Sequence, residues 1–498
     1  MDNKSAICAL IGHIEKNIKH KPDYLEMERI LGFSYRHIRS IFKDIAQISL
    51  SRYILTRKIA NAAFDIRHSE KSITDIAFEY EFTNPDTFTR AFRRETGMNP
   101  SMFKKSGHLC GRRIICPGVY APVVLDLAMF TLPKLKEVNA MGEMKKLADS
   151  CVLYGVPKVY YGRMEGGLMQ GTPFPMCLQS VLNYMGQNIS YAELMAYSGA
   201  AFRMRWDVDG WNFGAVDIRF TYESHHRPFE LAFKGAGRSF QISENPNAPK
   251  SIIKQDAIAL IKSEIDCGRP VIALGVVGPP EACIVTGYKD NGESLLGWSL
   301  FQGDGGGVDE FSGDCQIDES GYFIKSNWWD NTNAIMSVGE EIGTIVPAKE
   351  VLENAYMLMT KELVHTYNGG QDFLGGQAAY EAWAKALEDD ASFTDSARAE
   401  EIGWCHGDAE TMLGEGRSFA SAYMYMLVDA HPGLATDINE CARLLGDASG
   451  CVGKMWNARN GKSLQDRALR LELAGLVRLA AKYEKDACLI LSGVIDGM

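Results

Sequence analysis

Residues 31–43, LGFSYRHIRSIFK, and residues 72–97, SITDIAFEYEFTNPDTFTRAFRRETG, each carry signals for a tight turn next to a helix. In the first stretch, Gly32 suits the turn and Ser34 suits the N-cap of the helix that follows. The second stretch opens at the capping residue Ser72, and its second helix restarts at a proline, which is favoured in a first helical turn. We therefore predict two helix-turn-helix motifs in tandem, an arrangement typical of proteins that read DNA.

The second helix of each motif is amphipathic, with apolar side chains on one face and polar, mostly basic side chains on the other. Between the motifs, residues 50–66 contain no Gly or Pro and predict a helix of about 25 Å. Major grooves on one face of B-DNA repeat every ~34 Å. A linking helix of this length would therefore allow the second helix of each motif to enter successive grooves. A helical bundle with a solvated basic face is the alternative interpretation.

Charge divides the chain in the same way. Residues 1–113 hold 20 Lys and Arg against 13 Asp and Glu, a net charge of +7, whereas residues 114–498 hold 32 against 50, a net charge of −18. We therefore expect residues 1–113 to contact phosphate and the acidic remainder of the chain to have another role.

The strings LGFSYRHIRSIFKDIAQISLSRYILTRKIANAAFDI and SITDIAFEYEFTNPDTFTRAFRRETGMNPSMFKK resemble the DNA-binding domain of the AraC/XylS family of transcription regulators. The resemblance covers about residues 6–105. Two positions depart from the family pattern, since Glu81 and Gln47 stand where glycine is usual. Both departures affect turn geometry.

The resemblance and the polar faces together give the candidate DNA contacts. Pro85 has no side-chain donor and Asp86 accepts only from cytosine, so we expect the second recognition helix to read less sequence than the first. The predicted DNA-contacting residues are Tyr35, Arg36, Arg39, Ser40 and Lys43 in the first motif, and Asn84, Asp86, Thr87, Arg90 and Arg94 in the second.

At 498 residues the chain is too long for one core and suggests about three domains. We predict an all-α double helix-turn-helix in 1–108, a connection in 109–150, an α+β domain in 151–346 and a helical bundle in 347–498. The N-terminal residues lack a signal pattern, and prolines interrupt the longest apolar stretch, so we expect a cytoplasmic protein without a membrane partner. The twelve scattered cysteines lack metal spacing, and we expect neither metal nor cofactor.

The middle region resembles the papain-like cysteine peptidase fold, particularly bacteriocin-processing peptidases and the N-terminal domain of butirosin biosynthesis protein H. The resemblance rests on PFPMCLQSVLNYMGQNISYAELMAYSG, GRPVIALGVVGPPEACIVTGYKDNG and GYFIKSNWWDN, with Cys177 at a helix start. Such enzymes need a histidine base, but Glu281 stands at its position, and Gln170 is one place further from Cys177 than the family's oxyanion donor. His225 and His226 are the remaining candidate bases. We therefore predict a non-catalytic domain; a peptidase or acyltransferase that uses Cys177 is the alternative.

A degenerate cleft retains the shape to bind a ligand, and aromatic residues with carboxylates suit an aromatic or cationic effector. For each aromatic residue, core packing is the competing interpretation. The candidate ligand-binding residues are Cys177, Tyr160, Tyr161, Trp206, Trp211, Phe213, Glu281, Trp298, Trp328 and Trp329.

The last third shows helical periodicity with Ala and Leu stripes and no catalytic constellation. It is expected to complete the ligand cleft, form a homodimer interface or stabilise the middle domain. The sequence does not distinguish among these roles. The combined prediction is a ligand-responsive transcription regulator that binds an operator in double-stranded DNA. A DNA-bending protein without a ligand is a further alternative.

Overall fold

The computed structural model describes residues 10, 13–14, 17–20, 24–46, 49–68, 71–96, 99–105, 144–161, 164–165, 168–212, 216–244, 254–302, 315–343, 346–365, 372–459 and 462–498. The chain divides into two compact units. The first comprises Met1–Glu137 with Met164–Met169, and the second Val138–Arg163 with Gln170–Met498.

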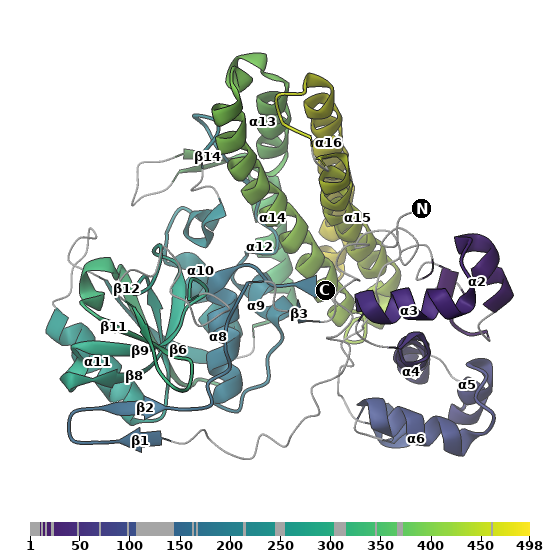
Figure 1. Ribbon diagram of the computed structural model, residues 1–498, viewed down its shortest axis with the longest axis horizontal. Coiled ribbons are helices and arrows are strands. Elements are labelled where there is room, and N and C mark those ends of the chain that lie inside the picture. Colours follow the sequence, from purple (N-terminus) through teal and green to yellow (C-terminus); the bar gives the residue numbers. More distant parts are fainter. Residues whose placement is uncertain are drawn as a thin grey trace. The chain divides into compact units, whose positions relative to one another are not determined.

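The first unit contains the two predicted motifs. Its helices are α2 (Tyr24–Leu31), α3 (Tyr35–Ala46), α4 (Leu50–His68), α5 (Ile73–Glu79), α6 (Pro85–Thr96) and α7 (Pro100–Lys105). Helix α4 has 19 residues, which corresponds to about 28 Å. Figure 1 shows it end-on between α3 and α6, the second helices of the two motifs.

The predicted turn and capping residues act locally as expected. Gly32 has a φ of 71°, which suits a residue without a Cβ at the end of α2. The Ser72 Oγ accepts the backbone N–H of Asp75 at 3.1 Å and caps α5. The side chain of Asn84 accepts the N–H of Thr87 at 2.8 Å at the start of α6.

Each motif has its own apolar core, and the two cores share α4. Tyr53 and Ile54 of α4 pack in the core of the first motif, where Ile38 and Phe42 of α3 are buried. Further along α4, Ile59, Ala62 and Ile66 pack in the core of the second motif. Because the inward faces of α3 and α6 are buried in this way, their polar faces are held outward.

The turn between α5 and α6 contains a strained residue. Glu81 has a φ of 57°, a left-handed conformation in which a Cβ costs about 1 kcal/mol. We expect Glu81→Gly to unfold with a free energy about 1 kcal/mol higher than Glu81→Ala, measured by urea denaturation. Both variants remove the carboxylate that lies 3.9 Å from the Lys58 ammonium, so the difference isolates the Cβ. Equal stability of the two variants would contradict this account.

The second unit is built on an antiparallel sheet with the strand order β10-β11-β9-β8-β7-β12-β6, and with β2 paired to β8 and β1 to β2. Its strands are β1 (Met144–Lys146), β2 (Cys151–Leu153), β6 (Arg238–Glu244), β7 (Val271–Leu274), β8 (Ala282–Lys289), β9 (Ser294–Trp298), β10 (Gln316–Ile317), β11 (Phe323–Ser326) and β12 (Ala334–Glu341). Strands β7, β8 and β9 are buried along nearly their whole length, which accounts for their continuous apolar sequences.

Helices cover the sheet. Helix α11 (Lys254–Asp266) lies on one side, and α8 (Pro173–Tyr184) and α10 (Arg227–Gly235) lie on the other, as Figure 1 shows. Helix α9 (Tyr191–Tyr197) follows α8 and begins with a capping box in which Ser190 and Glu193 bond each other's backbone N–H groups. This arrangement confirms a sheet-containing middle region, and the papain-like identity stays a prediction.

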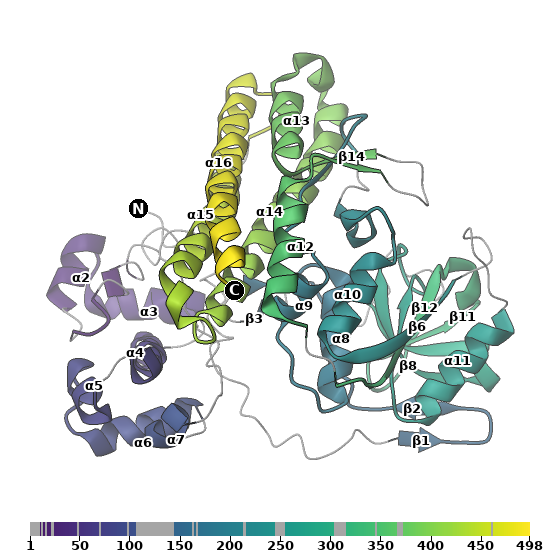
Figure 2. The same ribbon diagram turned by 180° about the vertical axis from the view of Figure 1, so that it is seen from behind.

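The last third is helical, as predicted. Its helices are α12 (Ala348–Thr360), α13 (Gly376–Glu388), α14 (Ser396–Leu427), α15 (Ala435–Arg459) and α16 (Arg467–Gly497). Figure 2 shows the long helices α14, α15 and α16 side by side. A small sheet of β13 (Leu363–His365), β14 (Asp372–Gly375) and β5 (Arg205–Asp207) joins this part to the middle region. Within the described ranges, no helix has the length and apolar character to span a bilayer.

Helix α14 contains glycines in its interior, where glycine is unfavourable. Gly414 and Gly416 lie inside the continuous helix α14. A Cβ on Gly416 would lie 3.1 Å from the carbonyl oxygen of Ala201, so glycine allows the close approach of another backbone there.

Candidate DNA interface and candidate ligand site

Helix α3 presents a basic, exposed face. Arg36, Arg39, Ser40 and Lys43 are all exposed, while Ile38 on the opposite side of the helix is buried. This array can donate hydrogen bonds to guanine and to phosphate oxygens.

Tyr35, at the start of α3, differs from these four residues. Its ring lies 4.2 Å from the ring of Tyr24, and its backbone N–H donates to Glu28. Partial burial, together with a hydrogen bond to Tyr24, raises the pKa of Tyr35 to about 12. The Arg39 guanidinium lies 5.8 Å from the Tyr35 ring, so Tyr35 orients Arg39 as well as being a candidate contact itself.

Helix α6 presents a smaller polar face. Asp86 and Arg90 are exposed, and Thr87 is half-buried. Asn84 is exposed, but its side-chain oxygen is used to cap α6. The side chain of Arg94 lies outside the described residues, as does Gln47.

In the second unit, Cys177 is fully buried in the second turn of α8. Its thiol donates to the carbonyl oxygen of Ala282 at 3.4 Å, at the start of β8. The residue before Ala282 is Glu281, so the structure brings together the two positions that the papain-like resemblance pairs. A fully buried thiol that donates to a carbonyl is a poor nucleophile.

The N-terminus of α8 is occupied by a carboxylate from a distant helix. Glu415 of α14 accepts the N–H of Gly171 at 2.6 Å and the N–H of Thr172 at 3.0 Å. It also accepts hydroxyl hydrogen bonds from Thr172 and from Tyr191. Gln170, the candidate oxyanion donor, is buried and donates to Gln179 at 3.2 Å. Glu415 therefore ties α14 to the start of α8, while the side chain of the candidate oxyanion donor is engaged with α8 itself.

Two half-buried carboxylates lie in this region without a direct partner. Within the described part of the chain, neither Glu281 nor Asp408 of α14 forms a side-chain hydrogen bond or an ion pair. Burial, and then repulsion by Asp217 and Asp408, raises the pKa of Glu281 to about 7, opposed by Arg219 and Arg203. Burial raises the pKa of Asp408 to about 6. Uncompensated buried carboxylates are more typical of a binding site than of a core.

Tyr161 completes this group, which we call the carboxylate site: Tyr161, Cys177, Glu281 and Asp408. Burial, and then the negative charges of neighbouring groups with Glu281 first among them, raises the pKa of Tyr161. The ring of Tyr161 also meets Phe301 edge-on at 5.7 Å. The site therefore combines an aromatic ring with two carboxylates, and Tyr160 is the half-buried residue next to it in sequence.

Replacement of Glu281 should reveal its raised pKa through stability. The folded state keeps the Glu281 proton up to about pH 7, whereas the unfolded state loses it near pH 4.5, so the contribution to stability falls as the pH rises between these values. We expect Glu281→Gln to be about as stable as the parent at pH 5 and about 1–3 kcal/mol more stable at pH 8. Urea denaturation at both pH values measures this difference, and a pH-independent difference would contradict it.

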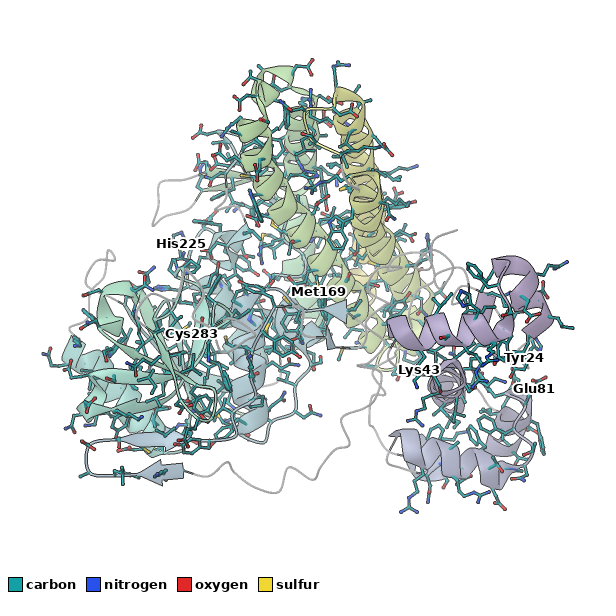
Figure 3. All side chains as sticks on the ribbon, viewed as in Figure 1. Tyr24, Lys43, Glu81, Met169, His225 and Cys283 are labelled. Carbon is teal, nitrogen blue, oxygen red and sulfur yellow. The ribbon has the colours of Figure 1, made fainter. Side chains whose placement is uncertain are left out.

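The two candidate histidine bases have contacts of their own. His226 pairs through Nε2 with Glu244 of β6. The ring of His225 packs edge-on against Phe220, and Figure 3 shows His225 apart from Cys283, the neighbour of Ala282. His226 is therefore engaged by a carboxylate, and the Cys177 thiol by the carbonyl of the residue that follows Glu281.

Our prediction of one aromatic-lined pocket needs correction, because the structure separates its members. Trp298 and Trp328 are core residues whose indole N–H groups donate to the Val156 and Gly292 carbonyls, both at 2.9 Å. Trp329 packs edge-on against Trp328. Phe213 lies outside the described residues.

Trp206 and Trp211 belong to the core of the helical part. Trp206 stacks on Trp383 of α13 at 6.3 Å, and Trp211 meets Trp206 and Phe393 edge-on. Their apolar surface is used to pack β5 and the following loop on α13 and α14. Conversely, Asp408 and Glu415 were not predicted, because no local sequence signal marks either residue.

The cysteines offer an internal comparison of reactivity. Among the described cysteines, Cys267 is exposed and Cys177 is buried. We expect iodoacetamide at neutral pH to alkylate Cys267 in the folded chain at least tenfold faster than Cys177, followed by peptide mass spectrometry. Both should react equally fast in urea. Faster modification of Cys177 than Cys267 would favour the catalytic alternative.

Comparison with known proteins covers the first unit. A family model described as a helix-turn-helix domain matches residues 27–106. The right origin-binding protein of Escherichia coli (strain K12) is 28% identical over 139 residues, which are 28% of this chain and 46% of that protein. Regulatory protein SoxS of Salmonella typhimurium is 29% identical over 104 residues, which are 21% of this chain and 97% of SoxS.

The chain spans about half the length of the first of these relatives. The crystal structure of an AraC-type transcriptional regulator from Chromobacterium violaceum matches 20% of this chain and 90% of its own length. Its identity is 20% and its TM-score 0.20.

Proposed function

We propose that the chain is an AraC-type transcription regulator that binds double-stranded operator DNA, because a helix-turn-helix family model matches residues 27–106. The observation that carries the proposal is the pair of exposed polar faces on α3 and α6, held outward by the two cores that share α4. Basic residues on the first face suit phosphate contact and guanine recognition. The named relatives, a regulatory protein and an origin-binding protein, support the same class.

Binding of a duplex under varied salt tests this proposal. We expect selection from a random duplex library to yield a preferred sequence, bound by the full chain with an affinity that falls steeply between 50 and 200 mM salt. Because each phosphate contact releases counterions, Lys43→Ala should reduce the salt slope by about 1. Absence of duplex binding at low salt would reject the proposed function.

We further propose that the carboxylate site binds a small aromatic or cationic effector. Glu281 and Asp408 lack direct partners among the described residues, and a cation placed between them would replace their lost hydration. The exposed part of Tyr161 offers a ring face for the same ligand. For regulation, the effector must bind more tightly to one arrangement of the chain than to another.

Benzyltrimethylammonium is a suitable first probe of the carboxylate site, because it combines a ring with a permanent cation. We expect it to raise the melting temperature of the full chain at pH 8, and the Glu281→Gln and Asp408→Asn variants to reduce this shift. Toluenesulfonate, an anion of similar size, is the matched control. An equal shift by both probes, or a shift unchanged in both variants, would reject this site.

A further inference from the structure

The first unit contains a pocket of about 210 Å³ between its two motifs. Its walls come from both motifs and from the helix that joins them: Tyr24 of α2, Ser51, Ile54, Leu55 and Lys58 of α4, and Tyr80, Glu81 and Phe82 of the second motif's turn. A protein cavity of ~150 Å³ holds benzene, so this pocket has room for one ring with a small substituent. In Figure 3, Tyr24 and Glu81 are labelled on the same side of this unit.

The lining is mainly apolar, and its charged side chains are Lys58 and Glu81. Ile54, Leu55 and Phe82 provide aliphatic and aromatic surface, while the Lys58 side chain is only 10% exposed. The Lys58 ammonium donates to the Tyr80 carbonyl at 3.0 Å and forms an ion pair with the Glu81 carboxylate 3.9 Å away. A ligand anion that approaches this pair would meet Lys58 in a low-dielectric environment, in a region of the chain with a net charge of +7.

From these observations, we infer that the pocket is a binding site for a compact molecule that carries one ring and one carboxylate. The ring would fill the space between Tyr24, Leu55 and Phe82, and the carboxylate would pair with Lys58. Glu81 lies at the turn with a third of its side chain exposed and is able to rotate toward solvent as the ligand anion replaces it. A cationic ligand is disfavoured because it would have to lie beside the Lys58 ammonium.

Such a ligand would contact residues that pack against both recognition helices. Tyr24 packs on Tyr35 of α3 with ring centroids 4.2 Å apart, and Phe82 packs edge-on against Phe88 of α6 at 5.1 Å. A molecule between Tyr24 and Phe82 would therefore contact one residue that packs against α3 and one that packs against α6. It would fix the angle between these two helices. This coupling to DNA rests on the proposed function, whereas binding itself does not.

Calorimetric titration of the full chain with benzoate tests the site directly, with benzylamine as the charge-inverted probe. We expect saturable benzoate binding, at least tenfold tighter than that of benzylamine. Ser51→Phe places a ring in the pocket from the exposed side of α4, and Lys58→Met removes the charge but keeps the stem. Each substitution should weaken benzoate binding at least tenfold.

Two controls separate this pocket from other sites. Ser101→Phe adds the same ring at an exposed position of α7, and Glu281→Gln alters the carboxylate site, so both should bind benzoate like the parent. No saturable binding of benzoate, equal binding of benzylamine, or unchanged binding in Ser51→Phe would overturn the inference. Because calorimetry needs no DNA, this result stands whether or not the chain proves to bind an operator.

Discussion

Replacing Arg417 with methionine is expected to lower the free energy of unfolding of the second unit by about 3–5 kcal/mol, because it leaves a buried carboxylate without its main partner. Arg417 of α14 and Glu484 of α16 are both fully buried, and the guanidinium Nε donates to the Glu484 carboxylate. Arg417 Nη1 also donates to the carbonyls of Ala201 and Arg203, both at 2.9 Å. After the substitution, the hydroxyl of Tyr380 remains a donor to Glu484.

An exposed arginine on the neighbouring helix is the matched control. Arg443 pairs with Glu440 and Asp447 on the surface of α15, where water screens the charges, so Arg443→Met should cost less than about 1 kcal/mol. The double variant Arg417→Met, Glu484→Met removes both buried charges and should recover most of the lost stability. Urea denaturation followed by far-ultraviolet circular dichroism compares all three. A similar, small loss in both single variants would show that the buried pair has no special role.

This ion pair also explains why part of the architecture was not predictable from sequence. Arg417 joins α14 and α16 to the loop after α9, more than 200 residues earlier. Caps and periodicity report neighbours a few residues apart, and Ser72 and Gly32 were therefore identified correctly. A contact between α14 and Ala201 depends on the whole fold, and Gly416, which permits the close approach, carries no local signal of it.

The candidate sites show the same difference between features set by local sequence and features set by long-range contacts. The exposed basic face of α3 was predictable because one amphipathic helix determines it. The proximity of Cys177 to residue 281 was inferred from a family resemblance and agrees with the hydrogen bond to Ala282. The tryptophans were grouped by residue type alone, whereas Trp206 packs in the core of the helical part and Trp298 and Trp328 are buried elsewhere in the second unit, because burial of a large apolar side chain stabilises the fold.

The second large effect concerns DNA. Removal of one base-reading arginine from each recognition helix, Arg39→Ala with Arg90→Ala, is expected to weaken binding to the preferred duplex by about 2–6 kcal/mol in total. Each guanidinium is exposed, so neither substitution disturbs a core. Because the sites lie on different helices, their effects should be roughly additive, and each single variant should lose about 10-fold to 100-fold in affinity. Fluorescence anisotropy with a labelled duplex at fixed salt measures the three variants.

Arg29→Ala is the control that distinguishes base recognition from loss of charge. Arg29 lies on α2, outside both recognition helices, and pairs on the surface with Glu26. The Arg29→Ala substitution removes one positive charge from the same unit, as the other two substitutions do. If the interface were purely electrostatic, all three single variants would therefore lose the same affinity, on all DNA sequences. Base reading by α3 and α6 instead requires that Arg39→Ala and Arg90→Ala reduce affinity for the preferred duplex far more than for a scrambled one. If the two arginine variants lose no more discrimination than Arg29→Ala, then α3 and α6 contact phosphate only, and sequence must be read by other residues or through DNA shape.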